Sequence, residues 1–547
     1  MERVAPCELV GCREGIGLMN NDGMHGTGGY PPFVNEPLGD FHEPARHSAF
    51  AGAVTSVDAE VGAQWERPIT IAGESFYTGR WVVSTDPNHP ARVVGRVASG
   101  SSEDVERAVV AAETAFATWS RVAVADRVAA VHRVSSLLRD RRDQFAAAMV
   151  IEAGKTWGEA DADVAEAIDF CEFYLRHALR LGSPQPVVHR SGTSNRFVYV
   201  PLGVGVIIPP WNFPLAIAVG MTMAAVVTGN TAILKPSSLT PAIAARFVDL
   251  CAEAGMPPGV VNFLGGPGEE VGMGLVAHPR VRFISFTGSR EVGELIYRTA
   301  SVVAPGQKWL KRVVAEMGGK NAIVVDETAD LDAAATAVVA SAFGFGGQKC
   351  SACSRLIVVD SVHDRLVELV IERTKQIRIG DPRDFSSDLG ALASADQKRT
   401  VERYIVIAHE EAKVVYGPDV RVPETGHYVA PHIVTEVASR SRLGQEEIFG
   451  PVLSVIRAAD FDDAIRTAND TDFGLTGAVF SRDEARLGRA VEEYQCGNLY
   501  LNRKCTGAFV GVEPFGGFNL SGTDSKAGGH DYLLLFLQGK SISTPTN

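Results

Sequence analysis

The sequence predicts an α/β protein with two parallel-sheet domains and a small β arm. Short apolar runs alternate with helical patterns from Trp81 to Val314, and a second alternation runs from Ala322 to about Leu501. The segment 187–203 and the C-terminal tail interrupt this regularity. Repeated strand–helix units are typical of parallel sheets that are covered by helices on both faces.

The composition is that of an ordinary globular protein. With 547 residues, 46% of them hydrophobic and 21% charged, the chain can form two or three domains with full cores. The net charge of −13 argues against binding to nucleic acid or to an anionic membrane, but not against a small-molecule substrate. The eight cysteines show no regular framework, so we expect reduced thiols, a cytoplasmic protein and no metal site.

The N-terminal region divides into two parts. Residues 1–30 are rich in glycine and lack periodicity, which predicts a disordered extension, with Met19 or Met24 as alternative start residues. A short helical arm is expected between Pro31 and Ala63. Ser101, followed by acidic residues and an Ala/Val-rich run, indicates the start of the next helix.

Four apolar strands are expected in the first domain, at Gly205–Ile208, Thr231–Leu234, Val260–Leu264 and Phe283–Phe286. The stretch from Leu202 to Ile233 has no charged residue and is long enough to span a bilayer. Its prolines at 209, 210 and 214 would break a spanning helix, so we interpret it as a buried strand, turn and helix.

The predicted β arm combines two distant segments. Alternating residues around Ser191–Thr193 predict a hairpin that projects from the first domain, and the tail is expected to form a strand from Leu533 onward. Both elements suit assembly into a homodimer or a higher multiple. The alternative is that both pack on their own subunit.

Cys350 lies in the Gly-rich segment 344–355, between a helical run at 331–343 and an apolar strand. A buried structural thiol is the usual fate of a free cysteine, and a redox pair with Cys353 is a second alternative. Glu316, 34 residues upstream, favours a third interpretation. A nucleophilic thiol and a carboxylate that activates water are the two groups needed to form and hydrolyse a thioester.

Other candidate residues follow the predicted strands. Asn212 closes the first strand, where its amide suits a developing oxyanion, although a capping asparagine is the ordinary alternative. Lys235 ends the next strand, within reach of a ribose or phosphate. The glycine turn at Ser289 offers backbone N–H groups to a pyrophosphate, with Gly268 as a weaker candidate. Glu447, before a Gly-Pro turn, can hold the hydroxyls of a ribose.

Taken together, these segments resemble the aldehyde dehydrogenase superfamily from about residue 80 to the C-terminus. The motifs are Pro-Trp-Asn-Phe-Pro, Lys-Pro-Ser, Phe-Thr-Gly-Ser, Glu-Met-Gly-Gly-Lys, Gly-Gln-Lys-Cys and Glu-Glu-Ile-Phe-Gly-Pro, in that order. The resemblance implies two Rossmann-like domains and an oligomerisation arm. The implied boundaries are 31–186 with 204–315 for the NAD-binding domain, 316–522 for the catalytic domain, and 187–203 with 523–547 for the arm.

A narrower resemblance links the chain to the Δ1-pyrroline-5-carboxylate dehydrogenases of proline catabolism. It rests on the segments 497–508 and 514–522, supported by 160–170 and by Asn35-Glu-Pro. Members of this group oxidise L-glutamate γ-semialdehyde to glutamate. The resemblance therefore implies that substrate, NAD as cofactor, and contact with a separate proline dehydrogenase.

The resemblance also implies roles for individual residues. Cys350 would be the nucleophile, Asn212 and the Cys350 N–H would form the oxyanion hole, and Glu316 would activate the deacylating water. Cofactor contacts would come from Pro210, Trp211, Lys235, Ser238, Gly268, Ser289, Glu447 and Phe449. Substrate contacts would come from Glu166, Phe213, Ser351, Gly507, Ala508 and Phe515.

Three questions stay open at this point. Many relatives have Glu where this chain has Ser238, and a Ser would not repel a 2′-phosphate, so NADP remains an alternative to NAD. A dehydrogenase for another semialdehyde, or one that uses coenzyme A, is an alternative within the family. A catalytically silent member kept as a binding protein is the alternative outside catalysis.

Overall fold

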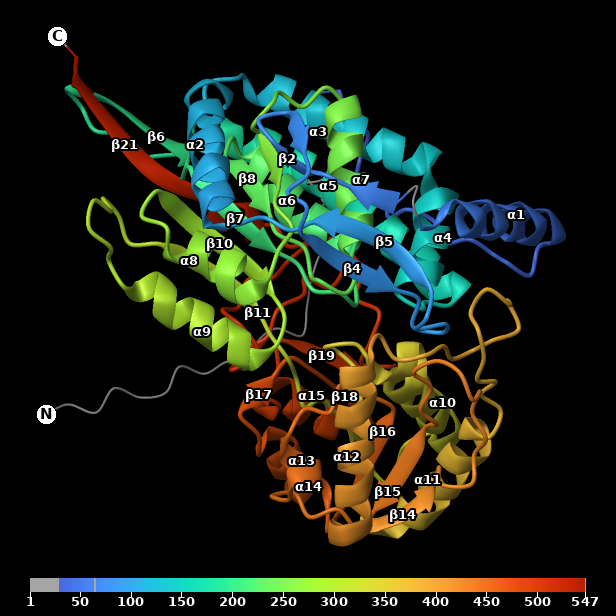
Figure 1. Cartoon of the computed structure of the whole chain (residues 1–547). Coiled ribbons are helices and arrows are strands. Elements are labelled where there is room, and N and C mark those ends of the chain that lie inside the picture. The colour runs from blue at the N-terminus through green and yellow to red at the C-terminus, as the bar shows by residue number, and fades with distance from the viewer. Residues whose placement is uncertain (1–28, 63–64, 547) are drawn as a thin grey trace, which may run out of the picture.

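The computed structural model describes residues 29–62 and 65–546, and it contains two lobes, each built on a seven-stranded sheet (Figure 1). The extension expected over residues 1–30 falls almost entirely outside the described residues, as do Met19 and Met24. The expected helical arm is α1, Pro44–Glu60.

The first lobe is built on the strand order β11-β10-β7-β8-β9-β2-β3. The strands from β11 to β9 are parallel, and β2 and β3 add an antiparallel edge. The four predicted strands are confirmed with small shifts of their ends. The bounds are β2 Ile69–Ile71, β3 Glu74–Phe76, β7 Val204–Ile208, β8 Thr231–Leu234, β9 Val261–Phe263, β10 Val281–Thr287 and β11 Arg312–Glu316.

Helices cover this sheet on both faces, and a small sheet of β1 (Glu66–Arg67), β5 (Val93–Ala98) and β4 (Trp81–Thr85) adjoins it. The helix start predicted at Ser101 is confirmed by a capping box, in which the Asp104 carboxylate accepts the Ser101 N–H at 2.9 Å. The helices are α2 Ser102–Trp119, α3 Val124–Asp140, α4 Arg142–Glu152, α5 Trp157–Gly182, α6 Ala216–Val227, α7 Pro241–Glu253, α8 Met273–Ala277 and α9 Arg290–Ser301.

The uncharged stretch from Leu202 to Ile233 forms β7, a proline-rich turn, the buried helix α6 and most of β8. The interpretation as a buried strand, turn and helix is therefore confirmed. Across residues 29–62 and 65–546, no helix combines the length and the apolar character that a membrane crossing requires.

The second lobe has the strand order β14-β15-β16-β13-β12-β18-β19, parallel except for β14. Its strands are β12 Ala322–Val325, β13 Arg355–Val359, β14 Lys413–Tyr416, β15 His432–Thr435, β16 Val452–Ala458, β18 Thr476–Phe480 and β19 Asn498–Leu501. Its helices are α10 Leu331–Phe343, α11 Asp360–Thr374, α12 Ala395–Glu411, α13 Arg442–Gln445, α14 Phe461–Asn469 and α15 Glu484–Glu493. The chain crosses between the lobes from the end of β11 at Glu316 to the start of β12 at Ala322.

The projecting arm differs from the predicted hairpin. β6, Thr193–Pro201, pairs antiparallel with β21, Leu537–Pro545, and together they form the ribbon that extends from the first lobe (Figure 1). Residues before Ser191 add only one bridge, between Gln185 and Phe197, because Pro184 and Pro186 lack the N–H groups that a ladder needs. The predicted local hairpin is therefore wrong.

The tail strand also begins later than predicted. Tyr532–Phe536 form a 3₁₀ helix, and the strand starts at Leu537. Tyr532, Leu533 and Phe536 are all buried, and Leu533 and Phe536 have the spacing of three residues that places side chains on one face of a 3₁₀ turn. An apolar run of this length does not by itself distinguish a helix from a strand.

Candidate active site

Cys350 follows a sharp turn at the end of α10. Phe345, Gly346 and Gly347 take φ values of 52°, 65° and 68°, which are left-handed. A Cβ on Gly347 would overlap the carbonyl oxygen of Gly450, so only glycine fits there. This turn ends the helix and presents the next residues at the junction of the two lobes.

Two asparagine side chains hold the loop that carries the thiol. Asn321 Nδ2 donates to the carbonyls of Cys350 at 2.7 Å and Ala352 at 2.9 Å. Asn212 is 4% exposed, and its Nδ2 donates to the Gln348 carbonyl at 2.9 Å. An amide NH₂ carries two hydrogens, so Asn212 retains one donor beside the thiol loop for an oxyanion.

The Cys350 thiol is half-buried and lies in the field of several carboxylates. Burial, followed by the charges of Glu316 and then Glu447, raises the pKa of Cys350 to about 12. The structure thus brings the Cys350 thiol and both sequence-predicted carboxylates together. At neutral pH the resting form is the thiol, so attack on a carbonyl requires the proton to leave.

Cys353 does not partner Cys350. It is buried, its Sγ donates to the Arg355 carbonyl at 3.2 Å, and it contacts the Cys505 thiol. The cysteines in the described part of the chain are all free. This geometry assigns Cys353 to the core of the second lobe and removes the support for a Cys350–Cys353 redox pair.

The Glu316 carboxylate is enclosed by the C-terminal part of the chain. Its Oε1 accepts a short hydrogen bond from Ser525 Oγ, and its Oε2 accepts the Gly517 N–H at 3.3 Å. A Cβ on Gly516 would lie 3.0 Å from Oε1, so the backbone there is in close approach. Burial raises the pKa of Glu316 to about 7, against the opposing effect of these hydrogen bonds. A carboxylate with such a pKa can accept and release a proton near neutral pH.

Glu447 and Phe449 lie beside the crossing between the lobes. Glu447 Oε1 accepts the Gly319 N–H at 2.9 Å, and burial raises the pKa of Glu447 to about 7. Phe449 has φ 55° and meets the Trp211 ring edge-on, with ring centroids 5.6 Å apart. Residues from both lobes therefore meet at this position.

The candidate cofactor residues of the first lobe gather at one edge of its sheet. Parallel strands end at the same edge, and there Pro210 follows β7, Lys235 follows β8, Gly268 comes shortly after β9 and Ser289 follows β10. Ser289 caps α9 by accepting the Val292 N–H at 3.4 Å. Ser238 is exposed just beyond Lys235.

Lys235 is a buried amine that forms no ion pair with the described residues. Its Nζ donates to the neighbouring Pro236 carbonyl at 2.9 Å, and burial lowers the pKa of Lys235 to about 8. A Cβ on Gly272, in the π-helical turn Gly268–Gly272, would lie 3.5 Å from the lysine stem. The glycine turn, which has no side chains at Gly268 and Gly272, and the Lys235 amine, which has one carbonyl partner, form a site that suits an anionic or hydroxyl-rich ligand.

The candidate substrate residues come from both lobes. Phe213 packs over Lys155, whose Nζ lies 4.1 Å from the ring centroid and 2.7 Å from the Asp163 carboxylate. Glu166 lies on the same helix as Asp163, and burial, followed by the Asp163 charge, raises the pKa of Glu166 to about 8. Ser351 is buried beside Cys350.

The loop after β19 carries the other three substrate candidates. Gly507 has φ 79°, Ala508 is half-buried, and Phe515 exchanges backbone hydrogen bonds with Ala527 at 2.9 and 2.7 Å. A left-handed residue at 507 leaves its backbone N–H open to a ligand without a side chain in the way.

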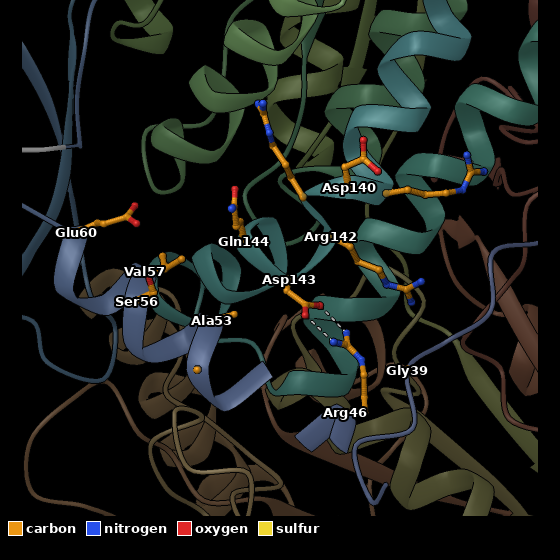
Figure 2. Close-up of a pocket in the computed structure, with 13 residues that line it drawn as sticks. Gly39, Arg46, Ala53, Ser56, Val57, Glu60, Asp140, Arg142, Asp143 and Gln144 are labelled. Carbon is orange, nitrogen blue, oxygen red and sulfur yellow. Dashed lines mark hydrogen bonds and ion pairs between the residues drawn. The ribbon is translucent and has the colours of Figure 1, made fainter. Parts of the chain in front are cut away.

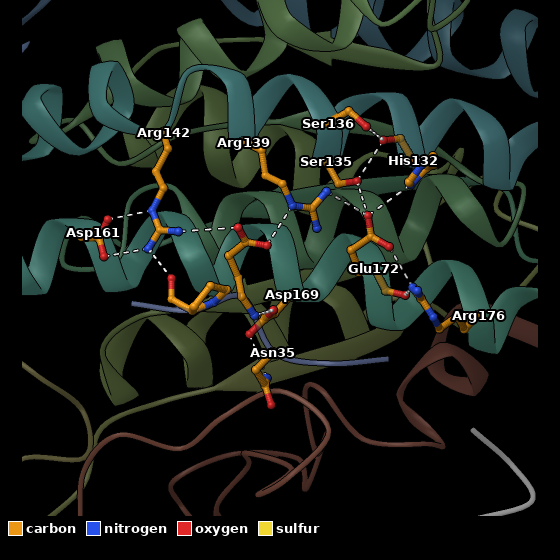
Figure 3. A network of polar contacts seen from close by, with 12 residues as sticks. Asn35, His132, Ser135, Ser136, Arg139, Arg142, Asp161, Asp169, Glu172 and Arg176 are labelled. Carbon is orange, nitrogen blue, oxygen red and sulfur yellow. Dashed lines mark hydrogen bonds and ion pairs between the residues drawn. The ribbon is translucent and has the colours of Figure 1, made fainter. Parts of the chain in front are cut away.

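The residues 30–46 run along α5 and fasten it to other elements (Figure 3). Asn35 Nδ2 donates to Asp169 Oδ2 at 2.8 Å and to the Val510 carbonyl at 2.9 Å. It therefore joins the helix that carries Glu166 to the loop that carries Gly507 and Ala508. In the sequence, Asn35 is indicated only by its place in the motif Asn35-Glu-Pro, which does not predict these contacts.

Three further residues at the site were not predicted: Lys155, Asn321 and Ser525. The sequence could have indicated Asn321, because it directly follows the Glu-Met-Gly-Gly-Lys motif and its amide can donate to backbone carbonyls of a nearby loop. The contact between Ser525 and Glu316 joins residues 209 positions apart, and no local pattern indicates it.

A separate cavity of about 570 Å³ lies between α1 and the junction of α3 and α4 (Figure 2). None of the sequence-predicted site residues lines it. Its arginines are paired with carboxylates, Arg46 with Asp143 at 2.6 Å and Arg142 with Asp161 at 2.7 Å. The chemistry described above is therefore located elsewhere, at the junction of the lobes.

Comparison with known proteins shows the family to which the chain belongs. The aldehyde dehydrogenase family model matches residues 78–542. The chain is 51% identical over 512 residues to 1-pyrroline-5-carboxylate dehydrogenase of Geobacillus thermodenitrificans, covering 94% of this chain and 99% of the relative. It is similar to the structure of 1-pyrroline-5-carboxylate dehydrogenase from Thermus with bound NAD, with TM-score 0.92 and 49% identity over 94% of this chain and 99% of that one.

Proline utilization A from Bdellovibrio bacteriovorus is another structural neighbour. Its TM-score is 0.92 at 41% identity, and the match covers 94% of this chain and 53% of that chain. The predicted α/β fold with two parallel-sheet lobes is confirmed by these matches, and the chain belongs to the aldehyde dehydrogenase family.

Proposed function

We propose that the protein oxidises L-glutamate γ-semialdehyde, formed from 1-pyrroline-5-carboxylate, to L-glutamate with NAD. The observation that carries this proposal is the meeting of Cys350, Glu316 and Asn212 at the junction of the lobes. We infer the substrate from the relatives named 1-pyrroline-5-carboxylate dehydrogenase, and the cofactor from the relative whose structure contains bound NAD.

The residues at the sheet edge fit a dinucleotide. Lys235, with a single carbonyl partner, suits the adenosine ribose, and the capped N-terminus of α9 at Ser289 suits a pyrophosphate. Glu447 and Phe449 suit the nicotinamide ribose, because a carboxylate accepts from two hydroxyls while an aromatic ring packs beside the sugar. NAD, when bound, supplies the acceptor for the hydride that leaves the substrate carbon.

The chain's own residues perform the remaining chemistry. The Cys350 thiol gives its proton to water and its Sγ adds to the aldehyde carbon. The oxyanion that forms is stabilised by Asn212 Nδ2 and the Cys350 N–H, at about 3 kcal/mol for each donor. After the hydride has left, the substrate is a thioester on Cys350. Glu316 takes a proton from water as the water attacks this thioester, and the thiol and glutamate are released.

The amino-acid end of the substrate meets two kinds of group. Ser351, Gly507 and Ala508 supply N–H and hydroxyl donors for the α-carboxylate, and the Glu166 carboxylate faces the ammonium group. Phe213 and Phe515 pack on the methylenes between the two ends. A zwitterion with a short aliphatic chain needs this combination of polar and apolar contacts.

The test separates the two half-reactions. Cys350→Ala should abolish oxidation, and substantial residual turnover would refute its role. Glu316→Ala should release one burst of NADH per site while steady turnover falls, because acylation needs no activated water. Loss of the burst would show that Glu316 also takes the thiol proton. Glutarate and succinate semialdehydes, which lack the amino group, should be poorer substrates, and coenzyme A should not replace water.

We further infer that the β6–β21 ribbon joins subunits into a homodimer or a higher multiple, since its strands project from the first lobe. Contact with a separate proline dehydrogenase is supported by the similarity to proline utilization A. NAD is the cofactor that we propose, and NADP is the alternative, because exposed Ser238 carries no charge that would repel a 2′-phosphate. The domain boundaries and the cytoplasmic location stay predictions.

A further inference from the structure

Ser525 is the side chain in closest polar contact with the Glu316 carboxylate. It is 4% exposed, and its Oγ donates a short hydrogen bond to Glu316 Oε1. The second oxygen, Oε2, accepts the Gly517 N–H at 3.3 Å. The segment that carries both donors is held in place by the paired backbones of Phe515 and Ala527.

The surroundings leave the Ser525 hydroxyl as the single side-chain donor to Glu316 among residues 29–62 and 65–546. Lys526 directs its Nζ to the carbonyls of Gly497 at 2.8 Å and Gly516 at 2.6 Å and pairs with the Asp524 carboxylate at 3.3 Å. It acts on Glu316 through its charge alone. The base is therefore held by the Ser525 hydroxyl and by the backbone N–H groups of Gly517 and Ser525, and only the hydroxyl is lost in Ser525→Ala.

The other titratable groups near Glu316 do not favour its ionised form. Cys350 and Tyr532 are both protonated at neutral pH, and the charge of Glu316 raises the pKa of each. Glu447 shares the surroundings of the thiol and carries the same sign of charge. Burial raises the pKa of Glu316, and the hydrogen bond from Ser525 is the largest opposing effect.

We propose that Ser525 is a positioning residue for the general base: its hydroxyl fixes the Glu316 carboxylate against Gly516 and Gly517 and stabilises the ionised form that accepts the proton from water. This inference rests on the function proposed for Glu316. No substrate or cofactor contact of Ser525 is required, because it acts through the carboxylate.

The experiment measures deacylation separately from acylation. After rapid mixing with substrate and NAD, samples are quenched with acid at intervals, and intact-mass spectrometry follows the decay of the acyl-enzyme from pH 5.5 to 9. A hydrogen bond to a charged group corresponds to a shift of about one pH unit. In Ser525→Ala, the midpoint of the deacylation profile should therefore rise by about one pH unit, with deacylation about tenfold slower at pH 6 and close to wild type at pH 9.

Two variants of equal shape isolate the hydroxyl. Ser525→Thr keeps the donor and should keep the wild-type midpoint, whereas Ser525→Val should behave as Ser525→Ala. The amplitude of the NADH burst reports whether each variant is folded and acylated. A wild-type midpoint in both Ser525→Ala and Ser525→Val, with full bursts, would overturn the proposal.

A parallel variant, Glu316→Gln, separates the proposed role of Glu316 from that of Ser525. If Glu316→Gln deacylates at the wild-type rate, then Glu316 is not the base, and both proposals fail. If Glu316→Gln stops deacylation while the Ser525 variants keep the wild-type midpoint, only the role of Ser525 is refuted.

Discussion

Replacing Asn35 by alanine should weaken binding of the amino-acid end of the substrate and leave the chemistry at Cys350 intact. Asn35 uses both hydrogens of its amide to join Asp169 on α5 to the Val510 carbonyl, at 2.8 and 2.9 Å. The first partner lies one turn of helix beyond Glu166, and the second lies two residues beyond Ala508. The side chain therefore sets the distance between two groups of substrate contacts.

The size of the effect follows from the bonds that are lost. A hydrogen bond to a neutral carbonyl contributes about 1 kcal/mol, and one to a carboxylate about 1.5 to 3 kcal/mol. Asp169 keeps the Glu36 N–H at 2.7 Å, so its carboxylate retains one donor. If about 1 to 2 kcal/mol of this loss falls on the substrate loop, KM for L-glutamate γ-semialdehyde should rise about 5- to 30-fold.

The assay compares two substrates on one variant. Propanal has no amino-acid end, so its kcat/KM should change by less than about twofold in Asn35→Ala. Asn469→Ala, which removes a 2.8 Å bond to the Glu493 carbonyl in the second lobe, is a matched control and should change neither substrate. An equal loss for both substrates, or an unchanged KM for the semialdehyde, would contradict the reasoning.

Three further outcomes are expected. Gly347→Ala forces an alanine into a left-handed conformation in a closed turn, and by displacing the thiol loop it should lower kcat at least about 100-fold. Gly158→Ala, which has open space around its Cβ, is the control and should keep the wild-type kcat in steady-state kinetics. Asp163→Asn leaves Lys155 as an unpaired buried charge and should lower the free energy of unfolding in urea by about 3 to 5 kcal/mol, and a loss below about 1 kcal/mol would contradict this. The pKa of Glu172 is below its ordinary value because hydrogen bonds and charges outweigh burial, so its stabilisation is present above pH 4.5 and is lost as pH falls. Glu172→Gln should therefore be less stable than the wild type at pH 7, and the difference in thermal midpoint should shrink below about pH 4.5; a difference independent of pH would rule out this origin.

Local patterns were sufficient to predict most of the fold. The strands around Ile207, Ile233 and Ile284 are apolar runs bounded by turns, and each is confirmed. The local hairpin around Ser191–Thr193 was predicted wrongly because local alternation carries no information about a partner strand more than 300 residues away. Tyr532–Phe536 was assigned to a strand because a short apolar run fits either element.

Some residues of the candidate site could be predicted from the sequence and others could not. Residues such as Cys350 and Glu316 stand in motifs, and the fold brings them together. Ser525 and Lys155 stand in no motif that indicates their contacts, because those contacts depend on how distant segments pack. The left-handed Phe345 is a further example, since a bulky residue with positive φ is not expected from sequence.

The short connection from Glu316 to Ala322 has a mechanical consequence. This segment leads directly from one sheet to the other. It also carries the Gly319 N–H that donates to Glu447 and the Asn321 amide that donates to the thiol loop. Any hinge rotation of one lobe against the other must twist this tether. The positions of Glu447 and of the thiol loop are thus coupled through the five residues 317–321 that connect the two sheets.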